Sequence, residues 1–206
     1  MKQVNKEAYN FERYSHPGRW VSYYHQIQEV LRLEPKSVLE IGSGDGVFRN
    51  YLRENTTIEY LNIDVAEDLH PDVIGSVTAL PFADKSYDVV CAFEVLEHIP
   101  FEQFERALAE MSRVARSYVV ISLPHFGPPI QFLLKIPLLR EFRFSMKIPF
   151  PQKHNFNGQH YWEIGKRGCS MKTVRVNLGK YFEIIREFVP FENQYHHFFI
   201  LRKKHE

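Results

Sequence analysis

The sequence has few cysteines, little net charge and no long apolar run, and each shortage excludes a class of protein. Its two cysteines, Cys91 and Cys169, lie far apart and form no C-x-x-C pair, so neither a disulfide scaffold nor a zinc knuckle is expected. The formal net charge of +1 leaves no basic footprint for nucleic acid. The first residues lack the apolar core of a signal peptide, and no apolar run is long enough to span a bilayer. These absences predict a cytoplasmic protein.

What the sequence does have is enough length and apolar content for one sizeable core. With 206 residues, of which 44% are hydrophobic, we expect a single domain over 1–206. Aromatic residues make up 15% and gather in the N-terminal region, 1–34, and after position 126. The N-terminal region is expected to contain a helix whose aromatic residues either close over a ligand or pack on a sheet. These residues are Tyr9, Phe11, Tyr14, Trp20, Tyr23 and Tyr24.

Strand-like and helix-like patterns alternate along the chain. Apolar runs predict strands at 37–41, 58–64, 72–74, 87–94 and 118–123, and helical spacing predicts helices at 20–31, 47–54 and 100–114. A helix capped by Ser170 and two strands, at 182–188 and 196–203, are expected to close the chain. This order predicts an α/β fold with a mostly parallel sheet and helices on both faces. In such sheets, ligands bind beyond the carboxyl ends of the strands.

The glycine-rich stretch VLEIGSGDG, at 38–46, lies at one of these strand ends. A dinucleotide-binding loop needs the spacing G-x-G-x-x-G, which would put the third glycine where this chain has Val47. Asp64 ends the next strand, where a carboxylate can accept hydrogen bonds from ribose hydroxyls. Glu40 suits a cationic ammonium or sulfonium group better than a pyrophosphate. The pattern disfavours a nicotinamide-dependent dehydrogenase and predicts a nucleoside site for a ligand with a cationic end.

Four stretches in this order, VLEIGSGDG, YLNIDV, VTALPFADKSYDVV and AFEVLEHI, resemble the class I S-adenosylmethionine-dependent methyltransferases, specifically the methyltransferase type 11 group. The similarity runs from about position 37 to about 123 and resumes in the last helix and two strands. It implies a Rossmann-like, seven-stranded sheet whose last strand is antiparallel. It also implies a methyl-transferring enzyme with S-adenosyl-L-methionine as cofactor, lying across the ends of the first strands.

The resemblance further implies which residues hold the cofactor. Glu40 and the loop backbone would bind the methionine end, and Asp64 the ribose hydroxyls. The family often has an acid contacting the adenine amino group where this chain has Ser76. Adenine is then left to the Ser76 hydroxyl, the Val77 backbone and apolar packing. The expected cofactor residues are Glu40, Gly42, Ser43, Gly44, Gly46, Asp64, Val65, Ser76, Val77, Leu80 and Glu94.

Histidines are the candidates for a general base, which an acceptor with a hydroxyl or an acidic carbon would use. His98 follows the fourth predicted strand, His125 follows the fifth, and His160 lies further on, so we take these three as catalytic candidates. For Glu97 and His98, a structural hydrogen bond at the strand end is an equally good interpretation.

The remaining histidines point less clearly to chemistry. His154, His160 and Glu163 lie in aromatic sequence without a regular element, so no metal site is expected. His196 and His197 belong to the last predicted strand and are expected to be structural.

Residues 124–168 form an insertion without strand–helix alternation, which is long for a loop inside one domain. EFRFSMKIPF, at 141–150, has a strand-like period, although Pro149 would confine it to an edge. Two interpretations stay open. We favour a lid over the acceptor pocket. Alternatively, 129–150 makes peripheral contact with an anionic bilayer and reaches a lipid-linked acceptor, using Lys135, Arg140, Arg143 and Lys147.

The sequence therefore predicts methyl transfer from S-adenosylmethionine to a small-molecule acceptor, at oxygen, nitrogen or carbon. Nucleic-acid bases are disfavoured as acceptors, because relatives that methylate them carry a proline–aromatic motif directly after the fourth strand. This chain has Glu94, Val95 and Leu96 there. A cofactor-binding partner subunit without catalysis is the main alternative, and turnover would discriminate between the two. The oligomeric state is left open.

Overall fold

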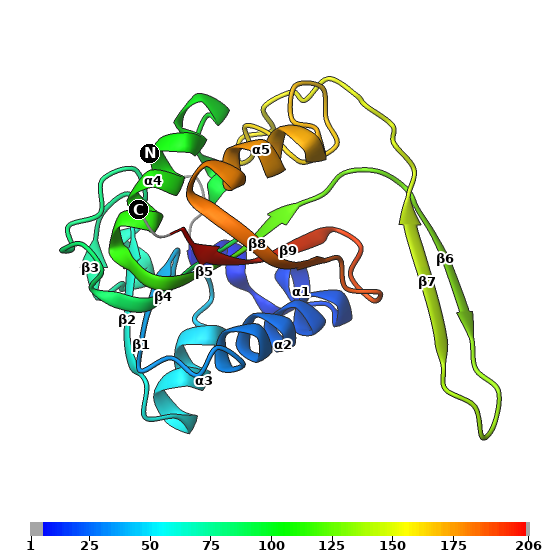
Figure 1. Ribbon diagram of the computed structural model, residues 1–206, viewed down its shortest axis with the longest axis horizontal. Coiled ribbons are helices and arrows are strands. Elements are labelled where there is room, and N and C mark those ends of the chain that lie inside the picture. Colours follow the sequence, from blue (N-terminus) through cyan, green and yellow to red (C-terminus); the bar gives the residue numbers. More distant parts are fainter. Residues whose placement is uncertain (1–5, 205–206) are drawn as a thin grey trace.

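A seven-stranded sheet forms the centre of the computed structural model, which describes residues 6–204 (Figure 1). Its order is β3-β2-β1-β4-β5-β9-β8. The strands are β1 (Ser37–Ile41), β2 (Glu59–Asp64), β3 (Val73–Ile74), β4 (Tyr87–Phe93), β5 (Ala115–Pro124), β8 (Phe182–Phe188) and β9 (His196–Lys203). Neighbouring strands are parallel, except that β9 is antiparallel to both β5 and β8. The predicted fold class, with its antiparallel last strand, is confirmed.

Helices cover both faces of this sheet (Figure 1). Helices α2 (Pro17–Leu31) and α3 (Val47–Asn55) lie on one face, and α4 (Phe104–Val114) and α5 (Met171–Tyr181) on the other. The buried strand β1 packs against both helix layers, because successive side chains of a strand point to opposite faces of the sheet. Val38 packs with α2 and α3, whereas Leu39 and Ile41 pack with α4 and α5. Among residues 6–204, each helix is too short or too polar to cross a membrane.

Short elements connect these layers on the side of the strand ends. They are η1 (Lys6–Tyr9), α1 (Phe11–Tyr14), η2 (Glu67–Leu69), η3 (Leu96–His98) and η4 (Phe101–Gln103). The predicted helix from position 100 begins with η4 rather than as an α-helix. The Gln103 N–H donates to the Pro100 carbonyl at 2.8 Å, which is the i to i+3 bond of a 3₁₀ turn.

Capping side chains fix the starts of two helices. The side chain of His16 accepts a hydrogen bond from the Arg19 N–H at the start of α2, and Pro17 occupies the permissive first position. At the start of α5, the Ser170 hydroxyl accepts from the Thr173 N–H at 3.1 Å. The predicted Ser170 cap is confirmed, and it satisfies one of the backbone donors that a helix leaves open at its N-terminus.

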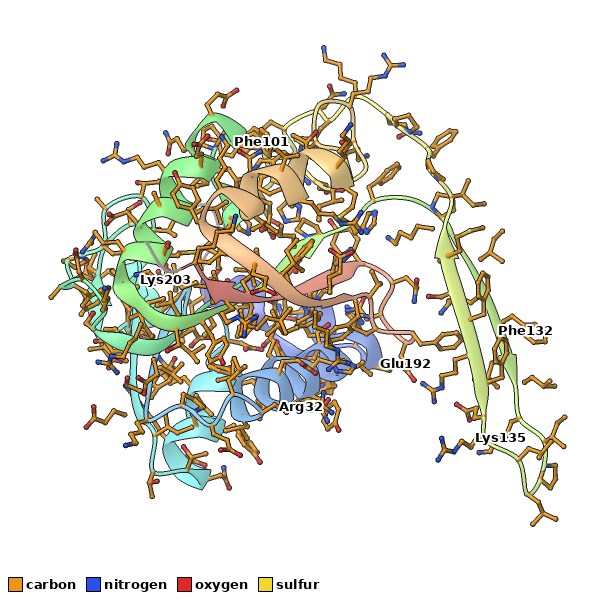
Figure 2. All side chains as sticks on the ribbon, viewed as in Figure 1. Arg32, Phe101, Phe132, Lys135, Glu192 and Lys203 are labelled. Atoms are coloured by element: carbon orange, nitrogen blue, oxygen red, sulfur yellow. The ribbon has the colours of Figure 1, made fainter. Side chains whose placement is uncertain are left out.

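The insertion contains a hairpin of β6 (Pro129–Leu134) and β7 (Phe142–Lys147), which pair as a separate antiparallel sheet. The hairpin extends away from the main body (Figure 1), and Figure 2 shows Phe132 and Lys135 on it. The Arg143 guanidinium donates to the Glu192 carboxylate of the β8–β9 loop. The predicted strand pattern is confirmed, with β7 ending before Pro149. However, the β6–β7 hairpin does not cover the seven-stranded sheet (Figure 1).

Candidate functional site

A cavity of about 400 Å³ lies at the carboxyl ends of β1, β2 and β4. This is the edge at which α/β sheets bind ligands, and the volume is within the range of small-molecule sites. Every expected cofactor residue except Leu80 lines it. Leu80 is instead buried in the core beneath α4, and its N–H donates to the Glu110 carboxylate at 2.7 Å. The structure thus brings three strand ends and the glycine loop around one space.

The glycine loop follows β1 and approaches the η3 side of the cavity closely. Gly42 has a φ of +87°, and a Cβ built there would lie 2.4 Å from Cγ2 of Val95. Gly46 adopts a φ of +79° at the N-cap of α3. Both the left-handed conformation and the contact with Val95 therefore require glycine in this turn.

Asp64 does more than face the cavity, because its carboxylate also holds the loop. One oxygen accepts a hydrogen bond from the Ser43 N–H at 2.7 Å, and the other accepts from the Ala66 N–H at 2.8 Å. Each carboxylate oxygen has a second lone pair. Asp64 can therefore keep its backbone partners while it accepts hydroxyl groups of a bound ribose.

Glu40 is buried at the end of β1 and lines the cavity floor. The Tyr60 hydroxyl donates a hydrogen bond to its carboxylate. Burial raises the pKa of Glu40 to about 8, against the opposing effects of the Tyr60 hydrogen bond and of Arg49. The charges of Asp45 and Asp64 act in the same direction as burial. A cationic ligand group would favour the ionised carboxylate, which is the partner that an ammonium group needs.

The N-terminal region closes one side of the cavity. Its lining residues come from η1, α1 and α2 and are Tyr9, Tyr14, Arg19, Tyr23 and Gln26. The other three aromatic residues named in this region have exposed side chains. Tyr9, Tyr14 and Tyr23 thus line the cavity, and closure of this region over a bound ligand stays a prediction. Sequence reasoning missed Arg19 and Gln26, because only the packing of α2 shows which of its polar residues face inward.

One contact joins this N-terminal wall to the glycine loop, and a second lies within the wall. The Tyr23 hydroxyl donates to the carboxylate of Asp45 in the glycine loop. The guanidinium of Arg19 lies over the Tyr14 ring, 4.2 Å from the ring centroid, which is a cation–π arrangement. The wall therefore combines aromatic faces with one cation.

The three histidines expected to be catalytic occupy different places. His98 lines the cavity, and its ring centroid is 5.0 Å from that of His160, which lies just outside the lining. His125 lies elsewhere, with its Nδ1 atom 3.0 Å from Nδ1 of His197, because β5 and β9 pair as antiparallel neighbours. Burial lowers the pKa of His98 to about 4 and those of His125 and His197 to about 3. Only His98, of the three, is placed against the cavity.

Two glutamates that follow β4 have few hydrogen-bond partners. Glu94 lines the cavity and adopts a φ of +54°, and its carboxylate lies 3.5 Å from Nε2 of His196. Glu97 is completely buried, and neither of its carboxylate oxygens has a hydrogen-bond partner within the described part of the chain. Burial raises the pKa of Glu94 to about 8 and that of Glu97 well above its ordinary value. The structural hydrogen bond, one of the two interpretations for this pair, is found for His98, whose Nδ1 lies 3.1 Å from the Gln159 carbonyl, and not for the Glu97 side chain among the described residues.

The insertion reaches the cavity at one point. Tyr161 lines the cavity, and its N–H donates to the Glu97 carbonyl at 2.8 Å. Neither strand of the β6–β7 hairpin contributes to the lining. The acceptor-site lid at 124–168 stays a prediction, and Tyr161 is the residue through which this segment reaches the cavity.

Comparisons with known proteins agree with this geometry. Residues 39–121 match a family model described as a methyltransferase domain. No curated protein matches the chain in sequence. The N-methyltransferase NodS from Bradyrhizobium japonicum WM9, solved with S-adenosyl-L-homocysteine, is 12% identical with a TM-score of 0.62, and the match covers 98% of this chain and 95% of NodS.

Two further solved structures have similar folds. Magnesium protoporphyrin IX methyltransferase (ChlM) from Synechocystis PCC 6803, with bound S-adenosylhomocysteine, is 15% identical with a TM-score of 0.60, covering 91% of this chain and 84% of ChlM. The (4+2)-cyclase SpnF is 13% identical with a TM-score of 0.61, covering 93% and 86%. At these identities the likeness concerns the fold, and a fold shared with a cyclase does not by itself set the reaction.

Proposed function

We propose, from the premise that residues 39–121 form the methyltransferase domain of an S-adenosylmethionine-dependent enzyme, that this chain methylates a small molecule bound in the same cavity. The observation that carries the proposal is the convergence of Glu40, the glycine loop and Asp64 on one space of about 400 Å³. A carboxylate for a cationic end and a second carboxylate for a ribose match the two polar ends of this cofactor.

Each part of the cofactor has a partner of suitable chemistry in the proposed binding mode. Ionised Glu40 and the loop backbone hold the methionine ammonium and carboxylate, and Asp64 accepts the ribose hydroxyls. Adenine lies against Val65, Ser76 and Val77, which line the cavity next to Asp64. The Ser76 hydroxyl, 2.9 Å from the Thr78 hydroxyl, is the polar side-chain group on this side of the proposed adenine site.

Methyl transfer needs little covalent help from the protein. A lone pair of the acceptor attacks the methyl carbon in line with the C–S bond, and the electron pair of that bond remains on sulfur. Because the sulfonium charge disappears, positioning and exclusion of water supply most of the effect. In the proposal, the tyrosines of the N-terminal wall and Tyr161 from the insertion exclude water from the reacting groups.

The lining favours a flat or acidic acceptor. Tyr9, Tyr14 and Tyr161 offer aromatic faces, and Arg19 supplies a cation beside them. NodS is described as an N-methyltransferase and ChlM as acting on magnesium protoporphyrin IX. These descriptions support a small-molecule acceptor and leave its identity and the methylated atom to experiment.

A second candidate is a lipid-linked acceptor, and the tip of the hairpin favours it. Leu138 and Leu139 are exposed between β6 and β7, and Lys135 and Arg140 flank them. An apolar tip flanked by cations is suited to an anionic bilayer surface. Sedimentation with phosphatidylserine-containing vesicles, but not with phosphatidylcholine vesicles, is the expected result for this candidate. It should be lost in a variant with both leucines changed to serine.

A transfer assay tests the proposed function. The purified protein is incubated with methyl-labelled S-adenosylmethionine and either the small-molecule or the lipid fraction of a cell extract, and labelled products are identified by mass spectrometry. Label in the small-molecule fraction, absent when Glu40→Gln protein is used, supports the proposal. Label only in lipid would instead select the second candidate. Label in neither fraction, from protein that binds the cofactor, would support the partner-subunit interpretation.

A further inference from the structure

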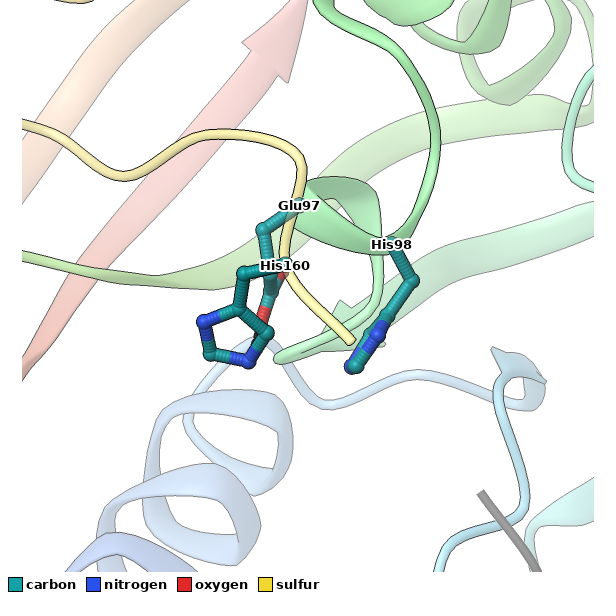
Figure 3. A group of neighbouring side chains, drawn as sticks. All are labelled: Glu97, His98 and His160. Atoms are coloured by element: carbon teal, nitrogen blue, oxygen red, sulfur yellow. Dashed lines mark ion pairs between the residues drawn. The ribbon is translucent and has the colours of Figure 1, made fainter. Parts of the chain in front are cut away.

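Three side chains at the edge of the cavity converge although they come from two distant segments. Glu97 and His98 belong to η3 after β4, and His160 belongs to the insertion (Figure 3). Each offers one possible ligand atom, and these atoms all lie within 4.8 Å of one another. Two metal bonds of about 2.1 Å span at most about 4.2 Å. Shifts of a few tenths of an ångström per side chain would therefore close the set around one ion.

Both imidazole rings are oriented as metal-binding histidines usually are. Nδ1 of His160 lies 3.2 Å from the Glu163 carboxylate, which also accepts a hydrogen bond from the Tyr195 hydroxyl at 3.0 Å. Nδ1 of His98 lies 3.1 Å from the Gln159 carbonyl. Such partners orient a ring and assign Nδ1 the proton, so that Nε2 serves as the ligand atom. Nε2 of His160 faces Glu97, at 3.9 Å from the carboxylate.

The Glu97 side chain supplies the independent observation. It is fully buried, and both carboxylate oxygens lack a hydrogen-bond partner among the described residues. Figure 3 shows the side chain extending toward the His160 ring, with His98 beside it. Buried carboxyl groups in proteins are hydrogen-bonded, paired with a cation or bound to a metal. Nε2 of His160, at 3.9 Å from the Glu97 carboxylate, is too far for a hydrogen bond. Glu97 is therefore buried as a metal ligand would be, without the hydrogen bonds that a structural carboxyl group makes.

We propose that Glu97, His98 and His160 bind a divalent transition-metal ion at the wall of the cavity, and that this ion holds an oxygen atom of the methyl acceptor. The ion site itself is independent of the proposed function, and only its role toward the acceptor rests on it. Two imidazoles and one carboxylate suit Zn²⁺ or Mn²⁺ and leave coordination positions open for a further ligand. No metal site was expected from the sequence, which offered His154, His160 and Glu163 as the possible ligands. In the proposed site Glu163 instead orients the ring of His160.

The proposed ion favours an acceptor that carries a hydroxyl or phenol group. Because His98 also lines the cavity, an ion at this place is within reach of a molecule bound beside the cofactor. A hydroxyl or phenol oxygen on the ion loses its proton more readily, because the charge of the metal stabilises the anion. That proton goes to solvent, the oxygen attacks the methyl carbon, and the C–O bond forms as the C–S bond breaks. Oxygen methylation is thus the reaction that the site favours.

Metal titration of the protein tests the site directly. Tag-free protein, stripped with a chelator, is titrated with ZnCl₂ and separately with MnCl₂ in a calorimeter. We expect one equivalent to bind, with affinity reduced at least about tenfold in Glu97→Gln and in His160→Ala. Glu163→Gln should lose about 10- to 100-fold, the usual effect of removing the partner of a ligating histidine. Glu102→Gln and His70→Asn are the matched controls at exposed positions, and asparagine tolerates the left-handed backbone of His70.

Three readouts keep this test decisive. Circular dichroism establishes that each variant is folded. X-ray absorption at the zinc edge should show two imidazoles and an oxygen ligand in the wild type. S-adenosylhomocysteine is titrated into the same preparations. Cofactor binding without metal binding would overturn the metal site alone, and metal binding without cofactor binding would overturn the proposed function alone. Wild-type metal affinity in folded Glu97→Gln and His160→Ala would place the ion elsewhere and overturn the proposal.

Discussion

The carboxylate of Asp64 accepts a hydrogen bond from the backbone N–H of Ser43 at 2.7 Å, so the end of β2 holds the glycine loop that follows β1. The other carboxylate oxygen accepts from the Ala66 N–H. One side chain therefore organises the loop and faces the cavity. In the proposed binding mode, Asp64 therefore couples cofactor binding to the stability of the loop.

Asp64→Ala should weaken both properties. Two backbone donors lose their acceptor, so we expect a loss of about 1–3 kcal/mol in the free energy of unfolding. Affinity for S-adenosylhomocysteine should fall at least about tenfold, about 1.4 kcal/mol, because the ribose also loses its acceptor. Urea unfolding and calorimetry measure the two quantities. Asp84→Ala is the control at an exposed position, and unchanged cofactor affinity in folded Asp64→Ala would remove the ribose assignment.

Glu40 gives the site a pH dependence of known sign. Burial raises its pKa to about 8, so the empty site holds the neutral acid at pH 6 and 7. An ammonium group binds the carboxylate, so binding releases a proton, and affinity should rise about ninefold from pH 6 to pH 7 and about fivefold from pH 7 to pH 8, where half of the carboxyl groups are already ionised. Glu40→Gln should bind weakly with a flatter profile. An affinity of the wild type that is constant over this range would contradict the role of Glu40.

The same shift affects the stability of the unliganded protein. An acid whose pKa is raised on folding stabilises the folded state most below its unfolded pKa, and this contribution is lost as pH rises toward about 8. Between pH 4.5 and about pH 8, the wild type should therefore lose unfolding free energy relative to Glu40→Gln, whose residue 40 does not titrate. Buffers of different ionisation enthalpy provide a second check on the proton released by the ligand.

Gly42→Ala should destabilise the protein by about 2 kcal/mol or more, because the φ of +87° is unfavourable for alanine and the new Cβ would meet Val95. Cofactor affinity should fall with it. Gly179→Ala is the matched control inside α5, where a Cβ meets no atom within 4 Å. That variant should gain about 0.5–1 kcal/mol from the better helix propensity of alanine. Equal unfolding free energies for the two variants would contradict a tight loop.

Tyr23→Phe tests the tie between the N-terminal wall and the loop. It removes the hydroxyl that donates to the Asp45 carboxylate, so we expect about 1.5–3 kcal/mol of lost stability and weaker cofactor binding. Tyr24→Phe is the same substitution at the next, exposed residue and should stay within about 0.5 kcal/mol of wild type. If the two variants unfold alike, the Tyr23 contact does not hold the loop.

Much of the fold is predictable because its signals are local. Apolar runs bounded by turn residues gave the strands Ser37–Ile41, Phe182–Phe188 and His196–Lys203 at their observed bounds. The glycine loop and Asp64 are predictable for the same reason, since strand ends and glycines are visible in sequence order. The 3₁₀ form of the first turn after Pro100 could not be predicted, because α and 3₁₀ turns differ by a small change in backbone hydrogen bonding.

The rest of the site depends on contacts between distant segments. Arg19 reaches the cavity only because α2 packs beside it, and no local pattern marks that position. His125 turns to His197 because β5 and β9 are antiparallel neighbours. Glu97 follows the end of β4, and it is completely buried where the insertion meets η3 through the Tyr161 N–H. Sequence reasoning therefore named His125 and Glu97 without their partners and missed Arg19.

Calorimetric titration of the purified protein with S-adenosylhomocysteine, beside NAD as a control, decides which cofactor the cavity binds. We expect saturable binding of S-adenosylhomocysteine with one site per chain, no binding of NAD, and tighter binding at pH 8 than at pH 6. Binding of NAD, or binding of neither compound by folded protein, would contradict the assignment of the cavity around Glu40 and Asp64 to the methyl-donor cofactor.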